Sequence, residues 1–181
     1  MSFTLILGPM KSGKSLELIA RVAPYEFADQ RVLYVQPKAN VRDSSIRSRL
    51  GINTDAISVA SLSEISKAFD VIGIDEINMF SPEDAAIIEG WLTQQKAVFV
   101  SGLDLDYRGK MPPIVQRLLE LKPDEVIWKI AVCDICKKYR AQFSQIVHDD
   151  EPVLAGLPLI TPEDGTYEYQ ARCRSCFVRR V

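Results

Sequence analysis

Four short apolar runs, separated by stretches of helical periodicity, limit most strongly what this chain can fold into. A run that is apolar at consecutive positions is typical of a strand buried on both faces of a parallel sheet. The runs cover residues 2–7, 31–35, 71–74 and 97–101, and the helical patterns cover 14–28 and 81–95. A less regular strand near 56–59 and a short helix near 62–68 are also expected. The alternation predicts an α/β fold with a mostly parallel sheet flanked by helices.

The second helical pattern has its own start signals. Ser81 is expected to be the N-cap, with Pro82 at the first helical position. Asp84 stands where a capping box places its acidic residue. The helix is therefore predicted to begin directly after Ser81.

The character of the chain changes after about residue 130. Paired cysteines, short β-rich runs and turn residues, as in "PEDGTYEY", replace the alternation. We therefore expect an α/β domain over residues 1–130 and a small β-rich lobe over 131–181.

Charge and hydropathy argue against two classes of protein, general nucleic-acid binders and membrane-spanning proteins. The 181 residues include 22 basic and 24 acidic side chains, a net charge of −2, so the basic excess of a general nucleic-acid binder is missing. No run of about 18 apolar residues is present, which argues against a membrane span. The first residues lack the basic segment of a signal peptide, and we expect a cytoplasmic protein.

The segment "GPMKSGKS" fits the phosphate-binding pattern G-x-x-x-x-G-K-[ST], between a predicted strand and a predicted helix. Backbone N–H groups of such a loop surround the β-phosphate of a nucleotide, and Lys14 would neutralise the β- and γ-oxygens. Ser15 would bind Mg²⁺. The alternative is a glycine turn with an exposed lysine. The predicted ATP-binding residues in this segment are Gly8, Pro9, Met10, Lys11, Ser12, Gly13, Lys14 and Ser15.

An acidic pair follows the apolar run in "VIGIDE". Asp75 would hold Mg²⁺ with Ser15 from the end of a strand neighbouring the first one, and it completes the predicted ATP site. Glu76 would point to the other side if the strand persists. A carboxylate there suits a general base that takes a proton from an attacking hydroxyl or water. The alternative is a solvated carboxylate at a strand end.

The four cysteines form two C-x-x-C pairs, "CDIC" and "CRSC". Cys133, Cys136, Cys173 and Cys176 can together bind a structural Zn²⁺ in a tetrahedron, each pair on a tight turn. A redox pair or four unrelated buried thiols remain as alternatives. The single histidine, His148, is expected to be a solvated loop residue.

Several stretches together resemble the type II, zinc-containing thymidine kinases. They are "GPMKSGKS", "VIGIDEINMF", "GLDLDYRGK", "CDIC" and "GTYEYQARCRSC", in that family's order. The resemblance implies transfer of the γ-phosphoryl group of ATP to the 5′-hydroxyl of thymidine or deoxyuridine. It implies Glu76 as the catalytic base, Asp75 as the Mg²⁺ ligand, and a homotetramer or dimer.

The same resemblance implies further site residues. Arg42 matches an arginine that faces phosphate, and Met10, Leu103 and Tyr107 fall where the family packs side chains around the base. Tyr169 matches a tyrosine of a loop, or lasso, that closes over the nucleoside. Departures from the family pattern include Lys11, where an aromatic residue is usual, the string 77–79, and Pro112.

Two other functions remain open from the residues. One is a P-loop ATPase or translocase whose zinc lobe binds nucleic acid. It is favoured by a basic cluster of Arg172, Arg174, Arg179 and Arg180. The other is a weakly active nucleotide-binding homologue, suggested by the missing aromatic residues.

Overall fold

The computed structural model describes residues 2–40, 45–47, 51–158 and 165–179. Its largest unit is a six-stranded sheet of order β5-β2-β6-β7-β1-β8, in which every pair of neighbours is parallel. The strands are β1 (Phe3–Leu7), β2 (Val32–Pro37), β5 (Ile57–Val59), β6 (Val71–Ile74), β7 (Ala97–Gly102) and β8 (Glu125–Trp128). The predicted α/β fold with a parallel sheet is confirmed.

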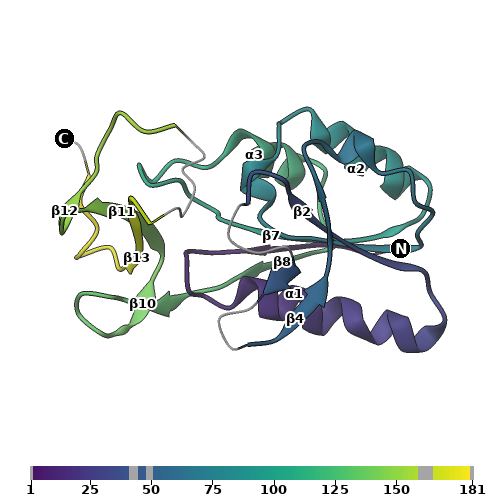
Figure 1. The fold of residues 1–181 in the computed structure, drawn as a ribbon, viewed down its shortest axis with the longest axis horizontal. Coiled ribbons are helices and arrows are strands. Elements are labelled where there is room, and N and C mark those ends of the chain that lie inside the picture. Colours follow the sequence, from purple (N-terminus) through teal and green to yellow (C-terminus); the bar gives the residue numbers. More distant parts are fainter. Residues whose placement is uncertain (1, 41–44, 48–50, 159–164, 180–181) are drawn as a thin grey trace.

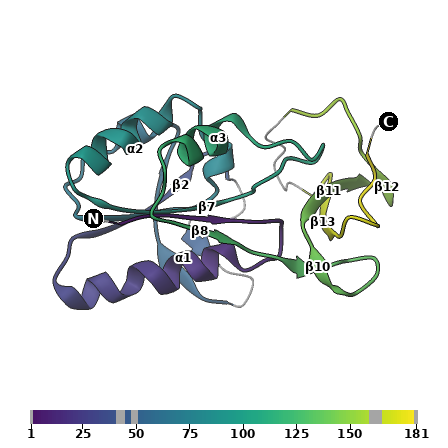
Figure 2. The same cartoon turned by 180° about the vertical axis from the view of Figure 1, so that it is seen from behind.

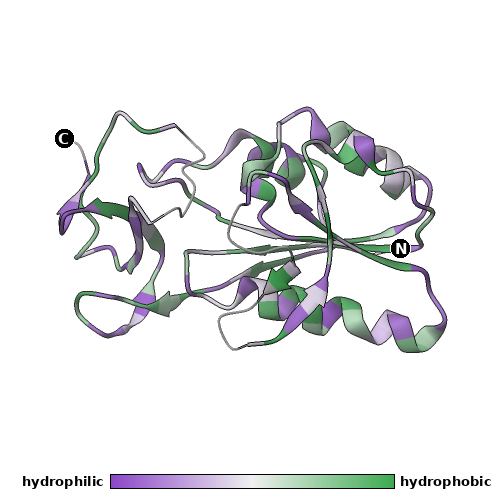
Figure 3. Ribbon diagram, in the orientation of Figure 1, coloured by the Kyte–Doolittle hydropathy of each residue, from purple (hydrophilic) through white to green (hydrophobic). Residues whose placement is uncertain are grey.

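Helices cover both faces of this sheet (Figures 1 and 2). Helix α1 (Lys14–Val22) lies on one face, and α2 (Asp84–Thr93) and α3 (Pro113–Glu120) lie on the other. Successive side chains of a strand alternate between faces, so Leu5 joins the core beneath α2 and α3 whereas Ile6 packs with α1. Both faces are buried, which is why the strands are apolar almost throughout (Figure 3).

Two helix predictions need correction. The predicted helix over 14–28 is α-helical only to Val22 and continues as the 3-10 helix η1 (Ala23–Ala28). Pro24 explains the change, because proline has no N–H and its ring collides with the carbonyl of residue i−4 in an α-helix. The predicted short helix over 62–68 is only the 3-10 turn η2 (Leu62–Glu64).

The predicted start of α2 is also wrong. The helix begins at Asp84, and Ser81 and Pro82 lie in the turn before it. The Asp84 carboxylate is buried, and it accepts hydrogen bonds from Ser81 N (3.2 Å), Leu62 N (2.8 Å) and Ser61 Oγ (2.8 Å). The bond from Ser81 N is the one that an acidic residue accepts in a capping box, so Asp84 takes its predicted capping role and also joins the starts of η2 and α2.

Replacing Asp84 with alanine should lower the free energy of unfolding by about 2–4 kcal/mol, because three donors in a buried site lose their acceptor. Urea unfolding followed by circular dichroism would measure the change. Glu89→Gln, an exposed change on the same helix, is the control and should shift the midpoint little. A loss below about 0.5 kcal/mol for Asp84→Ala would contradict this role.

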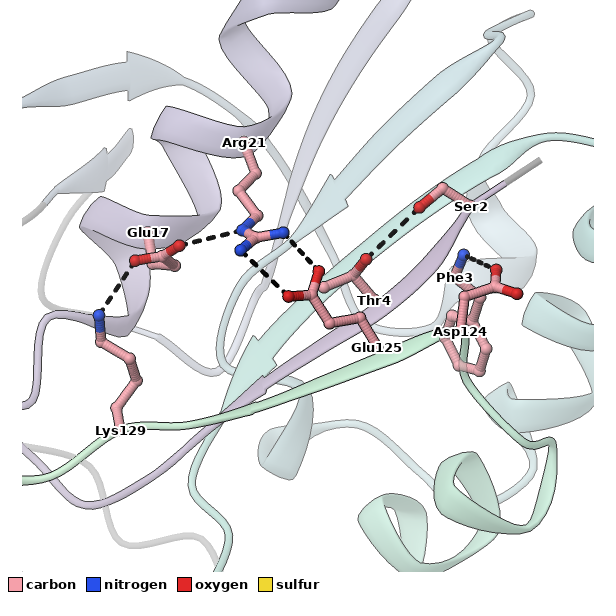
Figure 4. A network of polar contacts seen from close by, with 8 residues as sticks. All are labelled: Ser2, Phe3, Thr4, Glu17, Arg21, Asp124, Glu125 and Lys129. Atoms are coloured by element: carbon pink, nitrogen blue, oxygen red, sulfur yellow. Dashed lines mark hydrogen bonds and ion pairs between the residues drawn. The ribbon is translucent and has the colours of Figure 1, made fainter.

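Strand β8 was not predicted, and polar contacts join this edge of the sheet to α1 (Figure 4). Glu17 of α1 accepts hydrogen bonds from Arg21 Nε and from Lys129 Nζ, both at 3.0 Å. Arg21 also pairs with Glu125 of β8. The hydrogen bonds from Arg21 and Lys129 lower the pKa of Glu17. These contacts fix the helix that follows the glycine-rich loop.

A small antiparallel lobe lies beyond the carboxyl ends of the central strands (Figure 1). It consists of a pair, β9 (Ala131–Val132) with β10 (Tyr139–Ala141), and a sheet of order β12-β11-β13. The strands of that sheet are β11 (Phe143–His148), β12 (Glu151–Pro152) and β13 (Glu168–Arg172). A further pair, β3 (Ser45–Arg47) with β4 (Asn53–Asp55), lies near α1. Within the described residues, every helix is too short or too polar to cross a bilayer.

Candidate active site

The glycine-rich loop joins β1 to α1 at the carboxyl end of the sheet. Gly13 precedes the helix with a φ of 79°, a left-handed conformation that glycine adopts without strain. At the other end of the loop, a Cβ on Gly8 would lie 2.5 Å from the carbonyl oxygen of Lys129. Both glycines are therefore required by the path of the backbone.

Lys14 lies inside this loop. Its side chain is 6% exposed, and its Nζ donates a hydrogen bond of 2.8 Å to the carbonyl oxygen of Pro9. Ser12 Oγ donates to the same oxygen at 2.8 Å. The loop therefore curls around the ammonium group, unlike a simple glycine turn with an exposed lysine. A cation held at the N-terminus of a helix suits the binding of an anion.

Asp75 follows β6 at the same edge of the sheet. Its carboxylate is buried and accepts a hydrogen bond from Ser101 Oγ at the end of β7. The expectation that its strand neighbours β1 is wrong, because β7 lies between β6 and β1. All three strands are parallel, so their carboxyl ends still bring Asp75 to the edge where the loop lies.

Glu76 has an unusual backbone. Strand β6 ends at Ile74, so the alternation expected for a continuing strand does not apply. Glu76 has a φ of 51° and directly precedes the 3-10 turn η3 (Ile77–Met79). Non-glycine residues in this left-handed region are uncommon and cluster at functional sites.

The segment "GLDLDYRGK" follows β7 and contacts both η3 and the lobe. Asn78 Oδ1 accepts a hydrogen bond of 2.8 Å from Leu103 N. The Tyr107 hydroxyl donates to the carbonyl oxygen of Leu157, at 3.0 Å, in the segment between β12 and β13. Tyr107 and Leu103 are buried, at 4% and 9% exposure. This segment therefore connects the sheet edge to the part of the lobe expected to cover it.

Two cavities adjoin these segments. One of about 400 Å³ is lined by Leu103, Asp106, Met79, Phe80 and Pro112, among others, and is mainly apolar. The other, of about 610 Å³, lies between Lys11 and the lobe and is lined by residues including Tyr167 and Tyr169. The expected nucleoside-site residues Leu103 and Tyr169 thus line different cavities. Met10 is buried in the glycine-rich loop.

Asp104 was missed by the sequence reasoning. Its Oδ1 atom is buried and has no hydrogen-bond partner among the described residues. Burial raises the pKa of this carboxyl group, although the charge of Lys14 opposes the shift. Asp104 therefore lies close enough to Lys14 of the glycine-rich loop to interact with its charge. Its only sequence signal was its place in "GLDLD", which equally suits a turn.

The four cysteines converge as their spacing predicted. Their sulfur atoms lie within 4.8 Å of one another, and Cys136 Sγ is 3.7 Å from Cys173 Sγ. Tetrahedral zinc with Zn–S bonds of about 2.3 Å places its sulfurs roughly 3.8 Å apart. Each pair lies on a tight turn, in which Lys137 N donates to Cys133 O and Cys176 N donates to Cys173 O, both at 2.9 Å. The four thiols therefore fit a zinc site.

Hydrogen bonds among the four thiols shift their pKa values in opposite directions. Burial favours the neutral thiol of Cys173, but hydrogen bonds from Cys176 and nearby groups lower its pKa to about 6. Hydrogen bonding to Cys173 raises the pKa of Cys176 to about 12. Four adjacent thiolates cannot all be ionised unless a positive ion offsets their repulsion. His148 is exposed, as expected, but it does not lie in a loop, because it is the last residue of β11 and pairs with Glu151 of β12.

Comparisons with known proteins decide the family. The thymidine kinase family model matches residues 1–177. The chain belongs to the thymidine kinase family. This match confirms the resemblance found in the sequence. The members of that family are ATP-dependent phosphotransferases.

Individual thymidine kinases align over nearly the whole chain. The thymidine kinase of Mycoplasma capricolum is 37% identical over 185 residues, which cover 96% of this chain and 87% of that protein. The enzyme of Mycoplasma mobile is 35% identical, covering 95% and 84%. The enzyme of Chloroflexus aurantiacus is 33% identical, covering 96% and 92%.

Two sequence expectations about arginines, the phosphate-facing Arg42 and the basic cluster near the C-terminus, can be compared with the structure of this thymidine kinase family member. Arg42 lies outside the described residues, as does Arg180. The described arginines of the basic cluster make contacts within the lobe itself. Arg172 is buried and donates to Cys176 O at 3.2 Å. Arg174 and Arg179 lie 5.9 and 5.1 Å from the ring centroid of Phe143, which itself stacks on Phe177.

Proposed function

We propose that this protein transfers the γ-phosphoryl group of ATP to the 5′-hydroxyl of thymidine, producing dTMP and ADP. The observation that supports this most is the family match, because it spans both the glycine-rich loop and the four-cysteine lobe. A phosphate loop alone occurs in many enzymes and motors. The lobe that lies against the loop is what distinguishes this chain from a simple ATPase.

In the proposed site the loop from Gly8 to Ser15 holds the phosphates of ATP. Lys14, already held inside the loop, would turn toward the β- and γ-oxygens. Ser15 and Asp75 would hold Mg²⁺, which supplies positive charge to the oxygens of the transferred group. Arg42 would face the same phosphates.

Glu76 is the proposed general base. As the 5′-hydroxyl oxygen attacks the γ-phosphorus, its proton passes to the Glu76 carboxylate, and the bond from phosphorus to the bridging oxygen of ADP breaks. The constrained backbone at Glu76 supports this role, because a base must be held within hydrogen-bond reach of the proton it accepts.

The lobe is proposed to exclude water from the reaction, since exposed ATP would otherwise be hydrolysed. The Tyr107–Leu157 hydrogen bond supports this arrangement by joining the lobe to the sheet edge. Met10, Leu103, Tyr107 and Tyr169 are the proposed nucleoside-binding residues. Zinc would hold the two cysteine turns together and so fix the base of the lobe.

The alternatives receive less support. A nucleic-acid-binding lobe would need its arginines free to meet phosphates, but Arg172 is buried and Arg174 and Arg179 lie on aromatic rings. A weakly active homologue is suggested by departures from the family pattern, such as the string 77–79. We further propose the two domains 1–130 and 131–181, a homo-oligomer, and a reducing cytoplasmic location, which suits four metal-binding thiols.

The proposal predicts phosphorylation of thymidine or deoxyuridine when the protein is supplied with ATP and Mg²⁺. A coupled ADP assay across deoxynucleosides, with dTMP identified by mass spectrometry, would measure it. ATP hydrolysis stimulated by DNA but not by nucleosides would favour the translocase. Nucleotide binding without any phosphorylated product would favour the weak homologue.

A further inference from the structure

Lys11 lies at the centre of the phosphate loop, where its φ is 64°. A left-handed conformation is unfavourable for a residue with a Cβ, so the surrounding structure must hold it. Its Nζ forms an ion pair of 2.9 Å with Asp134 Oδ2. The two side chains are 29% and 26% exposed, so the pair is only partly shielded from water.

Asp134 belongs to the first cysteine turn, between Cys133 and Cys136. The oxygen that pairs with Lys11 also accepts a hydrogen bond of 2.6 Å from Ala171 N, and Asp134 N donates to Ala171 O at 2.8 Å. Ala171 lies in β13, which leads into the second cysteine turn at Cys173. A single carboxylate therefore contacts the phosphate loop and joins both cysteine turns.

The residue beside Lys11 makes a second contact with the same part of the lobe. Met10 N donates a hydrogen bond of 3.0 Å to Ser144 Oγ, which is buried. Ser144 of β11 is paired directly with Ala171 of β13. The consecutive loop residues Met10 and Lys11 are thus held by β11 of the lobe and by the adjacent first cysteine turn.

We propose that Lys11 is a positioning residue, which through Asp134 holds the phosphate loop in the shape that binds nucleotide. The proposal rests on the proposed nucleotide site but not on the identity of the nucleoside. The backbone N–H groups of the loop can surround a phosphate only if the loop keeps its curled path. The cysteine turn that holds Asp134 then supports the phosphate site without contacting ATP.

This role differs from a direct contact of Lys11 with phosphate. If Lys11 bound the phosphates itself, loss of its partner Asp134 would free it and would leave nucleotide affinity unchanged or increased. If Lys11 acts through Asp134, loss of either partner has the same effect. Loss of both should then add little to loss of one.

The test is the affinity of the zinc-loaded protein for AMP-PNP with Mg²⁺, measured by titration calorimetry. We expect Lys11→Met and Asp134→Asn each to raise the Kd about three- to ten-fold, the range for a partly shielded ion pair. The double variant should lie within about two-fold of the single ones. Lys11→Arg should restore most of the affinity, because it keeps the charge.

Zinc content and the unfolding midpoint of each variant separate this role from damage to the lobe. Lys11→Met should retain a full zinc content, so it remains informative even if Asp134→Asn disturbs the turn. Arg31→Met is the matched control. It removes the exposed Arg31–Asp70 ion pair at the amino ends of β2 and β6, at the opposite end of the strands from the loop, and should not change the Kd.

Additive effects, or an unchanged Kd in Asp134→Asn beside a raised one in Lys11→Met, would overturn the inference in favour of a direct phosphate contact. An unchanged Kd in both single variants would also overturn it. A wild-type protein that binds no AMP-PNP would instead refute the nucleotide site on which it rests. Failure to phosphorylate thymidine alone would leave the binding result standing.

Discussion

Replacing Glu76 with glutamine should lower kcat for nucleoside phosphorylation by about 10²–10⁴-fold, the range attributed to a positioned general base. Glutamine has nearly the same shape but cannot accept the proton of the 5′-hydroxyl. The Kd for AMP-PNP should change little, because the base acts on the nucleoside and not on the nucleotide. Steady-state kinetics with saturating ATP and thymidine would measure the effect.

Two further variants sharpen this test. Glu76→Asp keeps the carboxylate but withdraws it by one methylene, so an intermediate loss of kcat is expected. Glu89→Gln removes the carboxylate of an exposed residue on α2 and should leave kcat unchanged. If Glu76→Gln kept kcat within about three-fold of wild type, the assignment of the base would be refuted.

Removal of zinc should abolish activity and unfold the lobe. Among the described residues, the apolar cluster around the cysteine turns buries just the alanines Ala131, Ala141 and Ala171 besides the cysteines themselves. Such small side chains bury little apolar surface, so the metal must supply much of the stability of this region. We expect Cys173→Ala to bind no zinc and to lose at least about 100-fold in kcat/KM.

The measurement pairs zinc content by mass spectrometry with kinetics on the same sample. Ser175→Ala, an exposed change in the same cysteine turn, should keep both zinc and activity. Chelation of the wild-type protein should remove activity, and added zinc should restore it. Full activity in a zinc-free protein would refute a structural role for the metal. Activity that followed the oxidation of the thiols would favour the redox alternative.

The sequence predicted the central sheet well, because strands buried on both faces have a pattern that does not depend on distant contacts. Residues 71–74 were placed without error, and the strands at 2–7 and 97–101 to within one residue. The missed strand β8 contains Glu125, which pairs with Arg21 of α1. A charged residue in an edge strand breaks the apolar pattern by which buried strands are recognised. The strand could therefore be predicted only by knowing that Glu125 pairs with Arg21.

The candidate site divides in the same way. The curled path of the loop at Gly8, Gly13 and Lys14 and the convergence of the four cysteines could be predicted, because short spacings determine their geometry. The position of Asp75 relative to β1 was misjudged, because strand order depends on crossovers that the local sequence does not encode. Lys11 was only a departure from a pattern until the structure placed Asp134 beside it.

The position of β1 also determines when the nucleotide site can form. β1 holds the first residues of the sheet, but its two neighbours are β7 and β8, whose residues follow almost a hundred positions or more later. During synthesis this strand has no partner until most of the α/β part has been made. Gly8 additionally packs on Lys129, so the loop cannot close earlier. Folding of this site is therefore a late and non-local event, of the kind that is slow and exposes apolar strands to aggregation.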